Sequence, residues 1–327
     1  MYSVMMATMF FASTSHAPAL GIDGTDFTLD GKPTFLLGAS YYGALGIEDT
    51  RNVKLDLDDL GHCGFNWIRV WATWKYDDDN MSAVAADGAV RQPYMDRLER
   101  VCELAGQRGF VVDVTVTRGK APHFPSTQQQ HLNVITTLSQ KLQRFRNVYF
   151  DVANERNIGD DRYVSMTEVG ELIAAVKKSD PNRLCTASQG GDIASDEVTE
   201  YITVGKVDFL CPHRARGQHS PIETEAKTRA YLTFIKAAPR SVPVHYQEPF
   251  RRGYNDWNPV ENDFTTDLRG ARVGGAAGWC FHNGASRETK NGRPRRSFDM
   301  RPAEGRLFKQ LDSEEQAFLA RLRESAN

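Results

Sequence analysis

Short apolar runs alternate with segments of helical periodicity eight times along this chain, and that alternation constrains its fold more than any other feature. The apolar runs are rich in β-branched and aromatic residues, as buried parallel strands are. The predicted strands are residues 35–39, 66–71, 110–116, 148–153, 184–188, 207–211, 242–247 and 276–281. The predicted helices are residues 53–60, 94–108, 128–145, 163–179, 197–202, 223–238, 266–273 and 304–323.

Strands and helices in this order predict a single (β/α)8 barrel, an α/β fold, over residues 18–327. The alternative is an open doubly wound sheet, but no glycine-rich phosphate-binding turn follows the first strand. Before that strand, an Asp30-Gly31 turn joins two short apolar runs and predicts a hairpin. We expect this N-terminal hairpin to close the bottom of the barrel.

The alternation of side chains along three strands predicts which residues point into the barrel. Helices cover the outside, so the valines of residues 110–116 that share one face should point outward. The residues predicted to point inward are Trp67, Arg69, Trp71, Asp113, Thr115, Thr117, Asp151, Ala153 and Glu155. The same alternation places Asn154 and Glu155 on opposite faces. Both can therefore line one site only if the strand ends in a bulge or a bend.

Two glutamates directly follow predicted strands, the fourth and the seventh. Residues 148–153 run into Asn154-Glu155, and residues 242–247 run into Glu248. The carboxyl ends of barrel strands carry the active site, so both side chains should face one mouth. Paired carboxylates are the groups that cleave glycosidic bonds. The alternative is that both are structural carboxylates that end strands.

Other chemistries find no support in the sequence. It contains no HExxH motif, no His-x-His after a strand and no GxSxG motif, so we expect no metal, no cofactor and no nucleophilic serine. A formal net charge of −2 gives no reason to expect nucleic acid or an anionic membrane as a partner. No apolar run is long enough to span a bilayer. The cysteines are widely spaced, which favours buried thiols over a disulfide framework, and a monomer is the default expectation.

The N-terminal segment predicts export. Within residues 1–17, an apolar stretch over residues 4–12 is followed by Ser15-His16-Ala17, which is how a secretory signal peptide ends. We therefore expect a secreted or periplasmic protein. The basic residues that usually open such a peptide are missing, so the alternative is a disordered tail on a cytoplasmic protein.

Several motifs occur together in a characteristic order. They are Gly64-Phe65-Asn66-Trp67-Ile68-Arg69-Val70-Trp71, Asp151-Val152-Ala153-Asn154-Glu155, Asp180-Pro181-Asn182-Arg183-Leu184, Gln247-Glu248-Pro249 and Gly278-Trp279. In this respect the chain resembles the large clan of retaining β-glycosidases, whose best-known members are the cellulase-like enzymes of family five. The resemblance covers nearly the whole chain after the N-terminal segment, and it implies the same barrel.

The resemblance also implies roles for individual residues. Glu155 would be the general acid/base, Glu248 the nucleophile, Asn154 a ligand of the sugar 2-hydroxyl, Arg69 a partner of the nucleophile and Trp279 the platform under the cleaved sugar. The acid must hold a proton near neutral pH, so we expect a neighbouring carboxylate and a dry site to raise the pKa of Glu155. Retention requires the two carboxyl groups to lie only about 5–5.5 Å apart.

One motif departs from the family. Cellulase-like members carry His-x-Tyr after the sixth strand, whereas this chain has His213-Arg214-Ala215-Arg216. His213 and His282 remain candidate substrate ligands, with a packed histidine as the alternative, and His245 is expected to face outward. The tyrosine that would contact the nucleophile must be replaced or lost. The candidates to replace it are Tyr246, Tyr41 and Tyr42.

Basic residues are frequent after the predicted strands. They are Arg118, Lys120, Arg156, Arg214, Arg216, Arg251, Arg252 and Arg287. Arginine suits carboxylates, so an anionic glycan is one interpretation. Ion pairs with acidic residues of neighbouring loops are the interpretation we prefer.

The leading hypothesis is a retaining glycoside hydrolase that cleaves β-linked oligosaccharides or polysaccharides, as cellulases and mannanases do, through a covalent glycosyl-enzyme. A transglycosylase with the same glutamates and an inactive barrel that binds carbohydrate are the alternatives. The sugar and the linkage depend on loop shape, which the pattern of residues does not predict.

Overall fold

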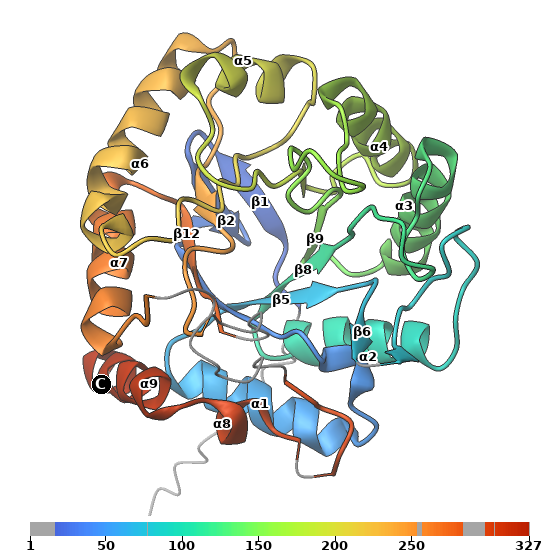
Figure 1. The fold of residues 1–327 in the computed structure, drawn as a ribbon, viewed down its shortest axis with the longest axis horizontal. Coiled ribbons are helices and arrows are strands. Elements are labelled where there is room, and N and C mark those ends of the chain that lie inside the picture. The colour runs from blue at the N-terminus through green and yellow to red at the C-terminus, as the bar shows by residue number, and fades with distance from the viewer. Residues whose placement is uncertain (1–16, 77, 254–256, 284–297, 304, 327) are drawn as a thin grey trace, which may run out of the picture.

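The computed structural model describes residues 17–76, 78–253, 257–283, 298–303 and 305–326, so the predicted signal peptide lies almost wholly outside the described residues. A ring of helices surrounds parallel strands in Figure 1. The barrel strands are β4 (Leu36–Ser40), β5 (Trp67–Trp71), β8 (Val111–Thr115), β9 (Val148–Asp151), β10 (Cys185–Thr186), β11 (His245–Tyr246) and β12 (Gly278–Phe281). They pair in the order β10-β9-β8-β5-β4-β12-β11.

Residues 208–213 fill the place of the sixth strand between β10 and β11. The amide of Asp208 donates to the carbonyl of Cys185, and the amide of His245 donates to the carbonyl of Leu210, each over 2.8 Å. Parallel bridges join Gln189 to Pro212 and Leu210 to Val244. The sheet thus closes on itself, and the predicted (β/α)8 barrel is confirmed.

The helices follow the strands as the sequence predicts. They are α1 (Thr50–His62), α2 (Tyr94–Gly106), α3 (Gln128–Leu142), α4 (Met166–Ser179), α5 (Ser195–Thr203), α6 (Ser220–Ala237), α7 (Glu261–Gly274), α8 (Leu307–Gln310) and α9 (Ser313–Ala326). The start of α4 differs from the prediction, because Ser165 caps it. The Ser165 hydroxyl accepts from the amide of Glu168, and the Glu168 carboxylate accepts from the amide of Ser165. Among the described helices, none is both long and apolar enough to cross a membrane.

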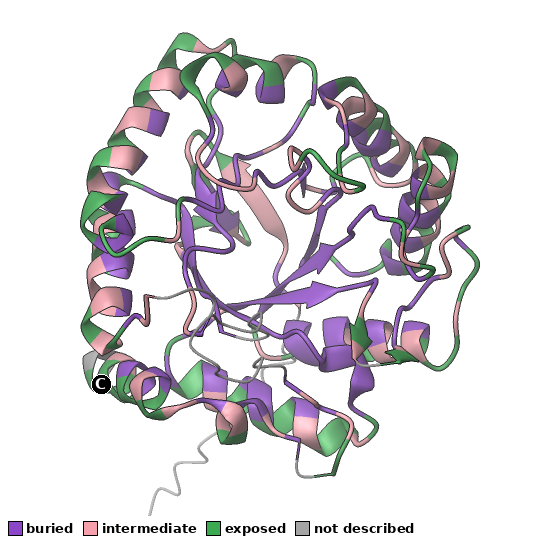
Figure 2. Ribbon diagram, in the orientation of Figure 1, coloured by how far each residue is buried: buried purple, intermediate pink, exposed green. Residues whose placement is uncertain are grey.

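Buried side chains separate into two cores. The larger lies between strands and helices and includes Val112, Val114 and Val116, as the alternation predicts. The smaller fills the barrel and includes Trp67 and Tyr149, whose rings stack. In Figure 2 the barrel strands are buried, and the outer faces of the helices are exposed.

Two expected orientations are wrong. His245 points into the barrel, where its ring lies 4.5 Å from that of Trp67 and its Nε2 lies 3.0 Å from the Tyr149 hydroxyl. Ala153 belongs to the outer core. The alternation fails at Ala153 because β9 already ends at Asp151. The five cysteines are buried and free of disulfides, as expected.

The N-terminal hairpin supplies an aromatic side chain to the inner core. The predicted Asp30-Gly31 turn joins β2 (Asp26–Leu29) to the short β3 (Lys32–Pro33), and β1 (Leu20–Asp23) pairs with the other edge of β2. Phe27 of β2 is fully buried, and its ring meets that of Phe209 edge-on at 5.0 Å. The hairpin therefore fills one end of the barrel with an apolar side chain.

We expect Phe27→Ala to lower the free energy of unfolding by about 3–5 kcal/mol, because the barrel cannot collapse onto the cavity that remains. Urea denaturation followed by tryptophan fluorescence measures this loss. The matched control is Leu55→Ala on the exposed side of α1, which should cost well under about 1 kcal/mol. An equal loss of unfolding free energy in both variants would contradict the conclusion that the hairpin fills one end of the barrel with the Phe27 side chain.

Candidate active site

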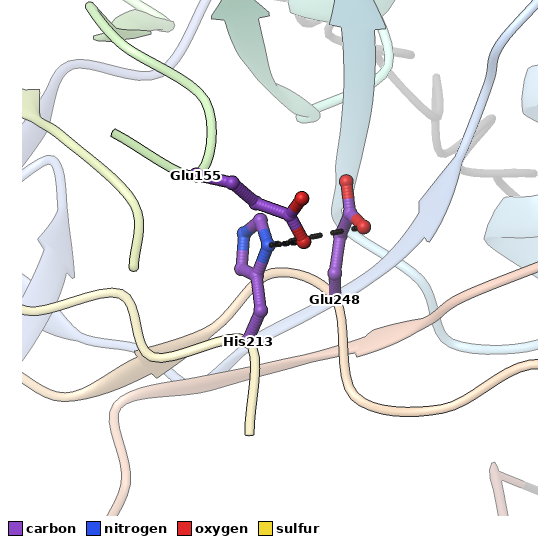
Figure 3. Close-up of side chains that lie close together, drawn as sticks. All are labelled: Glu155, His213 and Glu248. Carbon is purple, nitrogen blue, oxygen red and sulfur yellow. Dashed lines mark hydrogen bonds and ion pairs between the residues drawn. The ribbon is translucent and has the colours of Figure 1, made fainter. Parts of the chain in front are cut away.

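Glu155 and Glu248 face each other across the carboxyl end of the barrel, with His213 beside them (Figure 3). One oxygen of each carboxylate and one ring nitrogen of His213 all lie within 4.8 Å of one another. The two carboxylates come from chain segments that follow β9 and β11, far apart in the sequence. The structure therefore brings together the two glutamates that the sequence singled out, at a spacing close to that of retaining glycosidases.

A bend after β9 turns Glu155 toward this position. The strand ends at Asp151, and Glu155 adopts a left-handed backbone conformation with φ of 48°. Such a conformation costs a non-glycine residue about 1–3 kcal/mol, so the surroundings must hold it. Ser188 does so, because its hydroxyl accepts from the amide of Glu155 and its carbonyl accepts from the amide of Arg156, each at 3.0 Å. The bend that the alternation required is confirmed.

Arg69 contacts residues of both the fourth and the seventh βα unit. Its guanidinium is fully buried and donates to Glu248 at 2.5 Å and to Asn154 and Asp151 at 2.9 Å each. It also lies 3.0 Å from the carboxylate of Asp113. The same guanidinium forms core ion pairs and contacts Glu248.

Two further donors bridge the same pair of glutamate oxygens. Nδ1 of His213 lies 3.2 Å from Oε1 of Glu155 and 3.8 Å from Oε2 of Glu248. Nη2 of Arg216 lies 3.3 Å from the first of these oxygens and 2.8 Å from the second. Arg162 approaches Glu155 from another side, with Nη1 3.0 Å from Oε2. Arg162 was not predicted as part of the site, and Arg216 was predicted only as one of the basic residues that follow the strands.

These contacts determine the protonation of both glutamates. Burial raises the pKa of Glu248, but His213, His282, Arg69 and Arg216 together lower it below its usual range. Burial likewise raises the pKa of Glu155, but the hydrogen bond and charge of His213, with Arg216 and Arg162, give a net lowering. An ionised Glu248 suits a nucleophile. The expected raised pKa of Glu155 is wrong, because the hydrogen bond and charge of His213, together with the two guanidinium groups, outweigh burial.

An aromatic wall stands beside Glu248. Tyr42 stacks on Trp71 at 3.9 Å, and Trp74 packs against Tyr42 at 4.9 Å. Burial and the charge of Glu248 raise the pKa of Tyr42. Trp74 was not predicted as part of the site, although it closely follows the Trp67 to Trp71 motif.

His282 belongs to the same side of the site. Its Nε2 lies 3.4 Å from Glu248 and 2.8 Å from Arg251, which also donates to the Tyr42 hydroxyl at 3.1 Å. Ser40 holds the other ring nitrogen at 2.9 Å. The structure thus places the candidate ligands Tyr42, His213 and His282 around the glutamates.

Two predicted site residues point away from the glutamates. The indole of Trp279 donates to Asp267 of α7 at 2.6 Å, and the hydroxyl of Tyr246 lies 2.6 Å from that of Thr228 on α6. Trp279 and Tyr246 are register partners in β12 and β11, so both lie on the helix-covered face of the sheet. Both predictions are therefore wrong. Tyr41 also points outward, to Asp56 of α1.

The preferred interpretation of the loop cations is confirmed for four of the eight. Arg118, Lys120, Arg214 and Arg252 pair with Glu168, Asp161, Asp192 and Asp312, respectively. Arg156 donates to the carbonyl of Val164, and Arg287 lies outside the described residues. Arg216 is different, because it contacts the carboxylates of the two glutamates of the site.

Glu155, His213 and Glu248 are also the one group of described residues whose spacing could hold a metal ion. The charges nearby argue against this use. Arg216 contacts both carboxylates and Arg69 contacts Glu248, so a divalent cation would lie against two guanidinium groups. With two guanidinium groups beside the carboxylates, the site fits a ligand rich in hydroxyl or anionic oxygens better than a cation.

A (β/α)8 barrel whose fourth and seventh units end in facing glutamates defines the class of barrel glycoside hydrolases. Residues 20–202 match the family model for cellulase (glycosyl hydrolase family 5), more than half of the chain. The chain belongs to glycosyl hydrolase family 5 and is a glycoside hydrolase. No curated protein sequence matches it.

Solved structures of similar fold come from several organisms. A family 5 mannosidase from Rhizomucor miehei superimposes with a TM-score of 0.65 at 13% identity, covering 96% of this chain and 100% of that one. A family 5 glycoside hydrolase from Bacteroides vulgatus gives 0.63 at 15% identity, covering 97% and 70%. An endo-1,4-β-D-mannanase from Thermotoga petrophila gives 0.59 at 12% identity, covering 89% and 99%. At these identities the likeness concerns the fold.

Proposed function

We propose that this protein hydrolyses β-linked glycans with retention of anomeric configuration, with Glu248 as nucleophile and Glu155 as general acid/base. The observation that carries the proposal is the facing pair of carboxylates, of which one oxygen each lies within 4.8 Å of the other. That spacing leaves room for a sugar carbon to bond to one carboxylate, whereas inversion needs about 6.5–9.5 Å to admit a water molecule.

In the first step, Glu248 attacks the anomeric carbon while Glu155 gives its proton to the departing glycosidic oxygen. The carbon–oxygen bond breaks, and a glycosyl ester of Glu248 forms. In the second step, Glu155 takes a proton from water as the water oxygen attacks the same carbon, and Glu248 leaves as a carboxylate. Arg69 stabilises Glu248 as an anion before the first step and after the second.

Asn154 is positioned for the sugar 2-hydroxyl. Its Oδ1 accepts from Arg69 at 2.9 Å, which fixes the orientation of the amide and leaves its NH₂ group as the donor for substrate. Tyr42, Trp71 and Trp74 supply the aromatic surface that we initially expected from Trp279. An oligosaccharide or polysaccharide is the substrate, and the mannosidase and mannanase structures of similar fold make β-mannans the first substrates to try. Export to the periplasm or the medium remains a prediction from residues 1–17.

We expect the first product released from a β-glycoside to be the β-anomer. Proton NMR of the anomeric signals during the first minutes of hydrolysis measures this before mutarotation mixes the anomers. The panel should include aryl β-mannoside, β-glucoside and β-galactoside together with mannan and cellulose oligosaccharides. Initial α-anomer would contradict retention. Longer oligosaccharides as the dominant products would favour the transglycosylase, and binding without turnover would favour the inactive barrel.

A further inference from the structure

Arg216 bridges the two glutamates and therefore lies where the reacting sugar must bind. Nη2 of Arg216 contacts Oε1 of Glu155 and Oε2 of Glu248, and its side chain is only 12% exposed. Its Nε donates to the carbonyl of Pro249 at 3.0 Å, so the guanidinium is anchored beside the site. In a retaining mechanism the anomeric carbon lies between these same carboxylates. Substrate binding must therefore remove Arg216 from at least one of them.

Binding of a neutral sugar would give Arg216 weaker hydrogen-bond partners than the carboxylates it leaves. Its hydroxyl groups would replace carboxylates as hydrogen-bond partners, and hydrogen bonds between two charged groups are the stronger kind. A sugar that carries its own carboxylate would replace one carboxylate partner of Arg216 with another. In a uronic acid that carboxylate is attached to C5 of the ring, which only the ring oxygen separates from the anomeric carbon. An anionic group bound between the glutamates would therefore lie close to Arg216.

We propose that the sugar bound between Glu155 and Glu248 is a uronic acid residue, and that Arg216 selects it by pairing with its carboxylate. This inference rests on the proposed function and adds the substrate class. Arg162, whose Nη1 lies 3.0 Å from Glu155 on the other side, keeps a second guanidinium at the site after Arg216 has moved.

The same exchange prepares Glu155 for its role. Arg216 contributes to lowering the pKa of Glu155, which keeps the acid without its proton. When a uronate takes over Arg216, Glu155 loses a nearby cation and gains a nearby anion. Both changes favour the protonated carboxyl group. Recognition of the substrate anion and protonation of the catalytic acid are thus coupled through one side chain.

The test compares matched pairs of aryl β-glycosides, uronide against neutral sugar, in the gluco, galacto and manno configurations. We expect the better uronide to have a kcat/KM about 10- to 100-fold above its neutral partner, the size of a hydrogen bond between charged groups. Arg216→Gln should bring the ratio of kcat/KM for the uronide to that for its neutral partner close to one. The matched control is Arg229→Gln, which removes a cation from the exposed side of α6, where Arg229 pairs with Glu225, and should leave the ratio unchanged.

A pH profile provides a readout that a purely structural role would not move. The alkaline limb of kcat reports the acid in the enzyme–substrate complex. It should lie at higher pH for the uronide than for the neutral sugar in wild type. The difference should narrow in Arg216→Gln, where the charge of the substrate still acts on Glu155 but no cation is drawn away from it.

The outcomes separate this inference from the proposed function. Retaining hydrolysis of the neutral sugars at a kcat/KM equal to or above that of the uronides would overturn the uronic acid inference and leave the proposed function intact. A preference for uronides that Arg216→Gln does not reduce would do the same for the role of Arg216. Inertness of folded wild-type enzyme toward every aryl glycoside and the mannan and cellulose oligosaccharides would overturn the proposed function and this inference with it.

Discussion

Replacing Glu248 with glutamine should reduce kcat/KM for aryl β-glycosides by about 10⁴- to 10⁶-fold, the loss expected when an enzyme loses its covalent nucleophile. Glutamine preserves the shape of the side chain but cannot form the glycosyl ester. Arg69 keeps Asp113 and Asp151 as partners, so the fold should survive. Initial rates of nitrophenol release measure the loss, and circular dichroism confirms that the variant is folded.

Added azide distinguishes the nucleophile from the acid. In Glu248→Ala the small anion can enter from the vacated side, and the product should be an α-glycosyl azide. In Glu155→Ala the glycosyl-enzyme still forms from substrates with good leaving groups, and azide should then give a β-glycosyl azide. A β-glycosyl azide from Glu248→Ala, or full activity in Glu248→Gln, would reverse or remove the assigned roles. Glu261→Gln on α7 is the control for loss of a carboxylate outside the site.

Replacing Arg69 with methionine should lower the free energy of unfolding by about 3–5 kcal/mol, because it leaves buried carboxylates without their cation. Asp113 and Asp151 are fully buried and Glu248 nearly so, and each contacts the guanidinium within 3.0 Å. Urea denaturation at pH 7 measures the loss. Arg108→Met is the matched control, since its pair with Asp58 is partly exposed and should contribute less than about 1 kcal/mol. Similar losses in both variants would contradict the central role of Arg69.

The effect of Arg69→Met should also depend on pH. Burial raises the pKa of Asp113 to about 8, although Arg69 opposes the shift. Because this folded-state pKa exceeds the unfolded value of about 3.9, the native state binds the extra proton, and this group's contribution to stability falls as pH rises between the two values. Removing Arg69 raises the folded-state pKa further. The variant should therefore lose more stability, relative to wild type, at pH 8 than at pH 5.

The positions of the glutamates were predictable because strand patterns are local. Residues 148–153 and 242–247 have the apolar composition of buried strands, and a barrel directs the ends of all its strands to one face. Strict alternation then failed at both ends. β9 stops at Asp151 and β11 at Tyr246, so the side chains beyond them follow local turns, such as the left-handed Glu155 that Ser188 holds.

The errors at Trp279 and Tyr246 have a related cause. Both side chains are large and partly polar, which made them plausible sugar ligands, but both lie on the face of the sheet that the helices cover. Asp267 on α7 and Thr228 on α6 supply their hydrogen bonds. The helix that covers a strand, and the polar groups it offers, cannot be read from the strand alone.

The sequence by itself determined the barrel, the family resemblance and the two glutamates, because strand composition, helix periodicity and motif order are properties of neighbouring residues. Only the tertiary structure decided what surrounds those glutamates. Arg69 reaches Glu248, and His213, Arg216 and Arg162 reach Glu155 from separate segments. The hydrogen bond and charge of His213, with the charges of the two arginines, reverse the expected shift in the pKa of Glu155. Electrostatic energy depends on distances in space, and the order of residues along the chain does not contain those distances.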